Sequence, residues 1–376
     1  MNNSRSRFAI SSLFFLHGLC FSSWGARIPA IQEFHSLSEA SLGSILLAIP
    51  VGSILSMPVA ASLVSRFGSK RILSIAIMLY SVALITLGLA ETPLQLSAFL
   101  VCFGLCSNMV NVSLNTQAVD IEALYQKPIM ASLHGLWSLA GFVGAAIGTF
   151  MISHGIVPAH HFMVITVLAL LTTLFNFKYL LPSAPYKKAI DGKKFSWPDK
   201  SLLVLGIIAF CSMICEGAMF DWSGIYFKKV IGAQGGWVGA GYVAFMTTMA
   251  GTRFVADGFK ARFGIQKVLT VSGLMVFAGL ALSIVFPQMI FGIIGFLLVG
   301  SGVSAVVPLV FSEAGKSKTM SPSAAIAAVS TIGFLGFLIG PPLIGWIAGA
   351  SNLRFSFALI ALMGLMITLL AKSQKD

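Results

Sequence analysis

Long apolar segments follow one another along this chain, separated by short polar breaks. Most of them hold about 20 residues or more with few charges, which is enough for a helix to cross the ~30 Å hydrocarbon layer of a membrane. The breaks fall where glycine, proline and charged residues gather, as in Glu91-Thr92-Pro93 and Phe286-Pro287-Gln288. The pattern predicts twelve membrane-spanning helices, at residues 8–31, 38–63, 71–90, 94–118, 128–152, 160–181, 201–227, 236–259, 265–286, 288–312, 322–348 and 353–371.

The composition is that of a membrane protein rather than a soluble one. Of the 376 residues, 57% are apolar and 10% are charged, and the mean hydropathy of +0.92 exceeds what a soluble core needs. All five cysteines lie inside apolar segments, where cysteine is a packing residue, and no convergent set of histidine or carboxylate ligands accompanies them. We therefore expect no metal site and no cofactor.

Basic residues are distributed unevenly between the two sides of the predicted protein. If the N-terminus is cytoplasmic, all but four of the 24 lysines and arginines lie on inner loops, chain ends or inner helix ends. The four outer ones are Arg27, Lys228, Lys229 and Arg354. This asymmetry predicts that both termini are cytoplasmic. The net charge of +12 is then explained by anionic lipid headgroups facing the basic loops, and we expect no nucleic-acid partner.

The two halves of the chain are repeats. A hydrophilic segment at 182–200, read as a cytoplasmic linker, separates residues 1–181 from residues 201–376, each with six predicted spans. Arg66-Phe67-Gly68 recurs 196 residues later as Arg262-Phe263-Gly264, and other landmarks recur at nearly the same offset. The predicted fold class is therefore an all-α membrane protein of two pseudo-symmetric six-helix bundles, related by an axis along the membrane normal.

The loop between the second and third spans carries a family resemblance. Its sequence, Ala61-Ser-Leu-Val-Ser65-Arg66-Phe67-Gly68-Ser69-Lys70-Arg71, resembles the Gly-x-x-x-Asp-Arg-x-Gly-Arg-Arg signature of the major facilitator superfamily, with Ala61 and Ser65 in place of the glycine and the acid. Two further segments, Trp24-Gly-Ala-Arg27-Ile-Pro29 and the stretch from Glu216 to Ser223, are similar to a bacterial inner-membrane subgroup near the fucose and sugar permeases. The resemblance covers the full length and implies an alternating-access transporter.

In that family the signature loop latches the cytoplasmic gate, which implies a carboxylate partner for Arg66. Asp120 and Glu122, at the inner end of the fourth span, are the expected partners, and Glu313 is the corresponding partner for Arg262. The alternative is that these are solvated loop charges worth under ~1 kcal/mol each. The repeat favours the latch. Its further expected members are Arg71, Arg253 and Asp257.

Glu216 is the principal candidate for proton coupling. It lies inside the seventh span, roughly 16 Å from the outer end at the ~1.5 Å rise of a helix. A carboxylate at that depth is costly unless it is paired, hydrated or protonated, which favours a proton or substrate site over a structural hydrogen bond. Asp221 is a second carboxylate nearer the outer interface. His17, expected at the depth of Glu216 in the symmetry-related first span, is either a proton relay or a satisfied core residue.

Polar side chains in other spans are candidate solute contacts. Asn108, Asn111 and Asn115 have the i, i+3, i+7 spacing of one helix face, where amides either bind a hydroxylated solute or join helices. The resemblance implies that spans one, four, seven and ten line a central cavity. The other candidates are Trp137, Ser301, Ser304, Arg27, Trp24 and Trp222. For the last two tryptophans, an aromatic belt at the membrane interface is the favoured alternative.

We expect a proton-coupled transporter that takes up a small polar solute, such as a sugar or a related metabolite, and acts as a monomer in the bacterial inner membrane. Two alternatives stay open: a proton-driven exporter of drugs or metabolites, and a non-transporting membrane binding protein or sensor. No segment resembles a phosphate-binding loop, a hydrolytic triad or a metal cluster, which argues against ATP-driven transport and against an enzyme. The expected partners are the solute, protons and membrane lipids.

Overall fold

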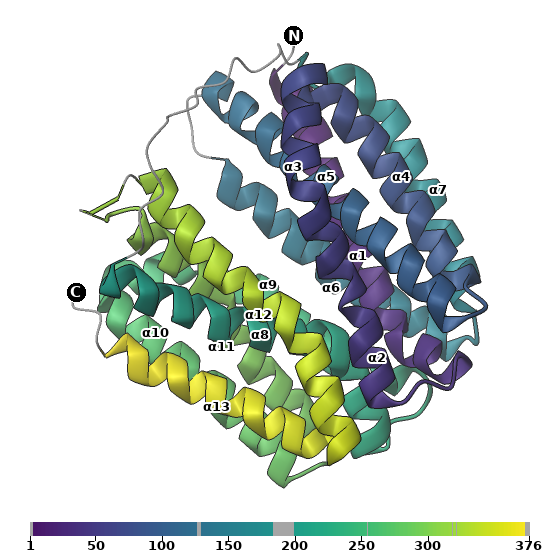
Figure 1. Ribbon diagram of the computed structural model, residues 1–376, viewed down its shortest axis with the longest axis vertical. Helices are drawn as coiled ribbons and strands as arrows, with labels where there is room; N and C mark the ends of the chain where they lie inside the picture. Colours follow the sequence, from purple (N-terminus) through teal and green to yellow (C-terminus); the bar gives the residue numbers. More distant parts are fainter. Residues whose placement is uncertain are drawn as a thin grey trace. The chain divides into compact units, whose positions relative to one another are not determined.

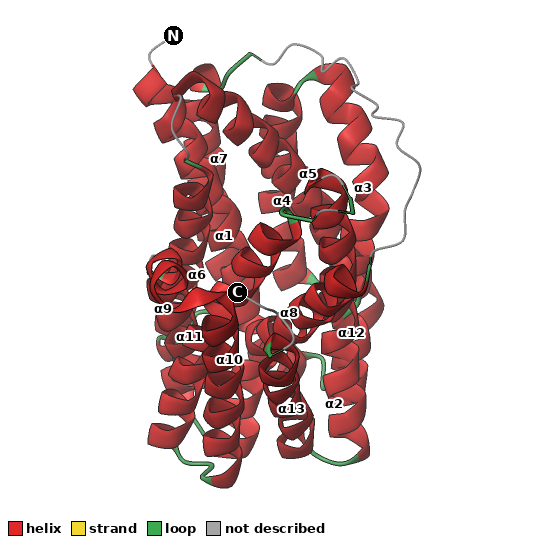
Figure 2. Ribbon diagram, turned by 90° about the vertical axis from the view of Figure 1, so that its left-hand side faces the viewer, coloured by secondary structure: helices red, strands yellow, loops and turns green. Residues whose placement is uncertain are grey.

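The computed structural model describes residues 3–125, 129–182, 199–253, 255–317, 319–320 and 322–372. Every regular element in these ranges is helical (Figure 1, Figure 2). The helices form two compact units, one of Met1–Ser36 with Ile45–Asp191 and the other of Leu37–Ser44 with Gly192–Asp376. Most of the predicted linker lies outside the described residues.

The first unit contains six long helices. They are α1 (Asn3–Phe34), α3 (Ala48–Phe67), α4 (Ser69–Leu89), α5 (Pro93–Tyr125), α6 (Met130–Ser153) and α7 (Pro158–Asn176), followed by the 3-10 helix η1 (Phe177–Tyr179). Helix α1 packs against α5, α6 and α7, while α5 also packs against α3 and α4. Helices α3 and α5 approach so closely that a Cβ atom on Gly52 or Gly104 would collide with a carbonyl of the facing helix. Such small residues allow tight helix packing in lipid.

The second unit is organised around α8. Its helices are α8 (Lys200–Tyr226), α9 (Ala240–Arg253), α10 (Ala256–Val285), α11 (Met289–Ala314), α12 (Pro322–Ala350) and α13 (Leu353–Ala371), with the π-helix η2 (Phe227–Ile231) and the 3-10 helix η3 (Gly235–Gly239). Helix α8 packs against α11, α12 and α13, and α11 also packs against α9 and α10. Helix α10 contains a turn at Gly264, where φ is 77° and ψ is 161°.

The predicted all-α membrane fold is confirmed. In the described part of the chain, eleven helices are long and apolar enough to cross a membrane. The span predicted at 236–259 is the exception, because its first residues form η3 and α9 has only 14 residues. The second span also differs from the prediction. It is divided at Leu47 into α2 (Glu39–Leu46) and α3.

The segment Leu37–Ser44 belongs to the second unit although it lies among the helices of the first half in sequence. Gly43 and Gly345 of α12 bring two backbones together, since a Cβ on Gly43 would lie 3.0 Å from the Cα of Gly345. Trp346 Nε1 donates a hydrogen bond to Ser44 Oγ at 3.0 Å. The compact units therefore depart from the predicted boundary at residue 181 in this segment.

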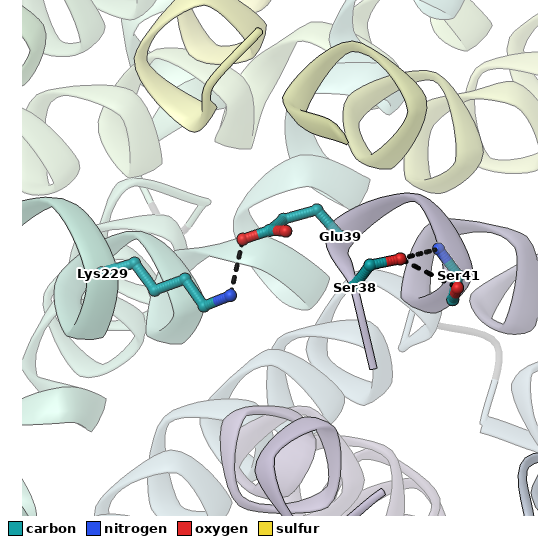
Figure 3. A network of polar contacts seen from close by, with 4 residues as sticks. All are labelled: Ser38, Glu39, Ser41 and Lys229. Carbon is teal, nitrogen blue, oxygen red and sulfur yellow. Dashed lines mark hydrogen bonds and ion pairs between the residues drawn. The ribbon is translucent and has the colours of Figure 1, made fainter. Parts of the chain in front are cut away.

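Figure 3 shows the polar contacts at the start of that segment. Ser38 Oγ accepts a hydrogen bond from the backbone N–H of Ser41 at 3.2 Å, which caps the N-terminus of α2. Glu39 Oε1 forms an ion pair with Lys229 Nζ of η2 at 2.5 Å. The acidic first residue also suits the positive end of the helix dipole. The cap and the ion pair together fix the start of α2 within the second unit.

Candidate functional site

Glu216 lies in the buried middle of α8 and faces an arginine. Arg253 Nη2, in the last turn of α9, is 3.6 Å from Glu216 Oε1, and the two side chains are 21% and 9% exposed respectively. A carboxylate in such surroundings needs a nearby opposite charge or a proton, because desolvation otherwise penalises its ionised form. Arg253 was expected to belong to the cytoplasmic latch. The structure instead places it beside the candidate proton-coupling carboxylate.

Asp221 is half-buried on the same helix, five residues beyond Glu216. Among the described residues, no ion pair involves it. Glu216 and Asp221 therefore lie in different chemical environments on the same helix. The first has a cationic partner and the second has none within the described chain.

His17 lies in the first unit, where four helices meet around it. Its Nε2 is 3.0 Å from Ser107 Oγ of α5, and its ring meets that of Tyr80 of α4 edge-on, at 5.3 Å between centroids. Trp137 of α6 lies 6.4 Å away by the same measure. The imidazole thus has a hydrogen-bond partner that can either give or take a proton. This is the arrangement of a satisfied buried histidine, and it leaves the proposed relay role as a proposal.

The three asparagines of α5 do not act alike. Asn108 Nδ2 donates to Ser56 Oγ of α3 at 2.7 Å, so this amide joins two helices. Asn115 Nδ2 donates to Asn111 Oδ1 at 3.1 Å along the same helix. Asn111 is exposed and Asn115 is half-buried. The structure therefore favours helix joining for Asn108 and leaves Asn111 and Asn115 as candidate solute contacts.

The other residues predicted to contact the solute differ in burial and in hydrogen bonding. Ser301 and Ser304 donate to carbonyl oxygens of their own helix, Leu297 O at 3.1 Å and Ser301 O at 2.8 Å. Trp137 is half-buried and packs against Phe21. Trp24 and Trp222 are 1% and 0% exposed, so the favoured expectation of an aromatic belt is wrong for both. These two side chains are buried on packing faces of α1 and α8.

The expected latch pairs are absent from the described residues. Glu122 Oε2 accepts the backbone N–H groups of Ile129 and Met130, at 2.8 and 3.0 Å, and so caps the start of α6. The guanidinium of Arg66 lies 5.2 Å from the ring of Phe67 and forms no ion pair with Glu122 or Asp120. The prediction overlooked the unpaired N–H groups at the helix start, which are stronger local partners for a carboxylate than a solvated arginine.

The second copy of the latch is corrected in the same way. Glu313 pairs with Lys316 at 2.8 Å, one turn along the chain, and Arg262 lies over the ring of Phe263 at 5.3 Å. Arg71 is exposed. The side chain of Asp257 lies outside the described residues. In this second copy, partners within four residues thus replace the long-range pair of Arg262 and Glu313 expected from the repeat.

Sequence reasoning missed two buried polar clusters in the first unit. Gln117 Nε2 donates to Ser69 Oγ and to Leu181 O, at 2.8 and 2.9 Å, and its Oε1 accepts from the Leu181 N–H at 3.0 Å. Arg27 Nε donates to His161 Nδ1 of α7 at 3.1 Å. A polar residue inside an apolar span is the only signal of either cluster, and it does not reveal the distant partner.

Comparisons with known proteins agree over nearly the whole chain. The family model of the Major Facilitator Superfamily matches residues 10–324. An uncharacterized MFS-type transporter of Yersinia pestis is 32% identical over 360 residues, covering 96% of this chain and 93% of the relative. The membrane protein MosC of Rhizobium meliloti is 31% identical over 366 residues, covering 96% of this chain and 88% of the relative.

Solved transporters share the fold at much lower identity. A bacterial homologue of the human lysosomal transporter Spinster, in an inward-facing and occupied conformation, has a TM-score of 0.75 at 15% identity, covering 97% of this chain and 95% of that one. The nucleoside transporter NupG has a TM-score of 0.73 at 13% identity, with 99% of both chains covered. The fucose:proton symporter FucP of E. coli has a TM-score of 0.65 at 16% identity, with 98% of both covered.

Proposed function

Because this chain belongs to the major facilitator superfamily, we propose that it is a secondary transporter that couples the movement of a small polar solute to protons through Glu216 and Arg253. The family and the relatives identify a transporter rather than an enzyme. The observation that carries the finer proposal is the 3.6 Å approach of Arg253 Nη2 to Glu216 Oε1 within the second unit.

The pair has two charge states. With Glu216 ionised, the buried charges compensate each other, whereas protonation of the carboxylate leaves the arginine charge alone. Because charge is costly inside a membrane protein, the two states favour conformations that differ in hydration around the pair. A proton taken up in one conformation and released in another is what couples a proton gradient to alternating access.

Other groups fit the same function. Asn111, Asn115 and Trp137 offer amides and an aromatic face for a hydroxylated solute, the chemistry of a sugar or related metabolite. FucP, a fucose:proton symporter, has the same fold, which supports this solute class and the use of protons. His17 and Asp221 are further candidate proton carriers. We place the protein in the inner membrane as a monomer with cytoplasmic termini.

The test is solute accumulation in proteoliposomes under an imposed pH gradient, across a panel of sugars. Glu216→Gln keeps the shape of the protonated acid but cannot titrate. We therefore expect it to exchange labelled solute across the membrane at a rate like that of the parent, yet to fail to concentrate it. Glu91→Gln, the same substitution at an exposed carboxylate between α4 and α5, is the matched control and should still accumulate solute. Accumulation by Glu216→Gln at the level of the parent would refute the assignment.

A further inference from the structure

Arg27 is a buried cation of the first unit without an anionic partner. Its side chain is on α1, seven residues before the end of the helix, or about 10 Å inside it at the rise of an α-helix. The residue is 2% exposed. No carboxylate of the described chain lies within ion-pair distance of it. A guanidinium in this position carries an uncompensated charge, which is strongly unfavourable in an apolar bundle.

The histidine that touches Arg27 adds a second donor. Arg27 Nε donates to Nδ1 of His161, which is fully buried on α7. Since Nδ1 accepts this bond, the neutral ring carries its proton on Nε2. His161 Nε2 and Arg27 Nη2 both lack a hydrogen-bond partner among the described residues. The cluster therefore has two unpartnered donor nitrogens and a positive charge, with no ion-paired carboxylate in the described chain.

Among the described residues, the neighbouring elements supply no ion-pairing carboxylate to the cluster. Helix α6 passes beside the cluster at Gly148, where an added Cβ would collide with Ala26 and lie 3.7 Å from His161 Cε1. One turn before Arg27 on α1, Trp24 has a buried indole N–H that also has no partner in the described chain. Indole, guanidinium and protonated Nε2 are all donors. Two buried hydroxyls on the same helices, Ser23 Oγ and Thr149 Oγ1, also lack partners within the described residues, but they are neutral, so they do not compensate the charge of Arg27.

We propose that Arg27 binds an anion through its unpartnered Nη2, while His161 holds the guanidinium in place by accepting the bond from Nε. A guanidinium is the group that recognises a carboxylate, and its N–H donors also bind a halide. The anion is either the carboxylate of the transported solute, which rests on the proposed transport function, or a small inorganic anion such as chloride, which does not. In the first case the solute class narrows to acidic sugars and related hydroxy acids.

Thermal unfolding of the purified full-length protein in detergent tests this directly. Sodium chloride and sodium formate are titrated separately, with the bulky sulfonate MES keeping the ionic strength constant. We expect a saturable rise in melting temperature with at least one of the two. Chloride alone identifies an inorganic anion, whereas a stronger response to formate identifies the carboxylate of a solute. A flat response to both salts in the parent overturns the site.

Variants of Arg27 test whether the rise in melting temperature comes from anion binding at this residue. Arg27→Gln and Arg27→Lys are both expected to raise the half-saturating concentration of the anion at least tenfold. The lysine variant keeps the positive charge at this position but lacks the planar guanidinium that binds the anion. Arg354→Gln is the matched control, because Arg354 is an exposed arginine that donates to Ile284 O at 2.6 Å. It should respond as the parent does. A response unchanged in both Arg27 variants also overturns the site. Glu216→Gln should retain the response, so a failure of proton coupling leaves this result intact.

Discussion

Gly68 and Gly264, which are 196 residues apart, have the same unusual backbone conformation, with φ, ψ of 83°, 147° and 77°, 161°. Each follows an Arg-Phe pair and turns the chain from one span into the next. This region of φ and ψ is almost closed to residues with a Cβ atom. The duplication visible in the sequence is therefore preserved in the backbone.

An alanine at either glycine should destabilise the protein. We expect Gly68→Ala and Gly264→Ala each to lower the free energy of unfolding by about 1–3 kcal/mol, because the methyl group is strained at this φ and ψ. Unfolding in mixed micelles of detergent and SDS measures the change. Gly251→Ala is the control, since Gly251 is helical with open space around its Cβ position, and it should be neutral or slightly stabilising. Equal effects at all three positions would contradict the strain argument.

The sequence predicts spans well and partners poorly, for a physical reason. Apolar runs bounded by Gly and Pro locate the helices because burial in lipid acts on each segment separately. A side-chain partner depends instead on which helices pack together. Glu122 and Arg253 show this: one caps a helix that begins eight residues later, and the other reaches Glu216 on a neighbouring helix. Residue type revealed that Glu216 needed a partner, but the partner was identified only by the packing of α8 and α9.

Gln117 should be a structural residue of the first unit. It is fully buried and joins the start of α4 to the chain after α7 through three hydrogen bonds. Gln117→Leu removes these bonds and leaves the Leu181 N–H and carbonyl without this partner, which should cost about 1–3 kcal/mol of unfolding free energy. Gln266→Leu is the control at a half-buried glutamine that donates a solvent-exposed hydrogen bond to Lys372 O, and it should cost much less. Equal losses would show that Gln117 has no special structural role.

Asp199 should make stability depend on acid pH. Its Oδ2 accepts from Thr319 Oγ1 at 2.6 Å and its Oδ1 accepts from the Leu202 N–H at 2.9 Å, and the Thr319 bond is the main reason that the pKa of Asp199 lies below its ordinary value. A lowered folded-state pKa means that the stabilisation is complete above the unfolded pKa of about 3.9 and is lost as the pH falls through the folded value.

Melting temperatures of the parent and of Asp199→Asn between pH 7 and pH 3 check this prediction. The difference between the two proteins should be largest at neutral pH and should shrink below about pH 4, where the parent also loses its carboxylate. A difference that stays constant over the whole range would rule out titration of Asp199 as its cause.

The orientation of the chain remains a prediction, and single cysteines can establish it. In a variant without the five native cysteines, His154→Cys lies between α6 and α7 and Lys316→Cys lies between α11 and α12, both at exposed positions. Cytoplasmic termini place the first outside and the second inside, because basic residues are retained on the inner side. An impermeant thiol reagent applied to intact cells should label only the first. Labelling of only Lys316→Cys would show that the termini lie on the outer side, which is the opposite of the predicted topology.

The Glu216–Arg253 pair should be coupled in stability as well as in transport. Arg253→Gln leaves a buried carboxylate without its counter-charge, which should cost up to about 3–5 kcal/mol. Adding Glu216→Gln to that variant removes the uncompensated charge, so the double variant should be more stable than Arg253→Gln alone. Arg262→Gln is the control at an arginine that has no ion pair in the described chain, and it should change stability by about 0.5 kcal/mol or less. If the two losses simply add in the double variant, the side chains do not interact, and the proton-coupling proposal loses the contact on which it rests.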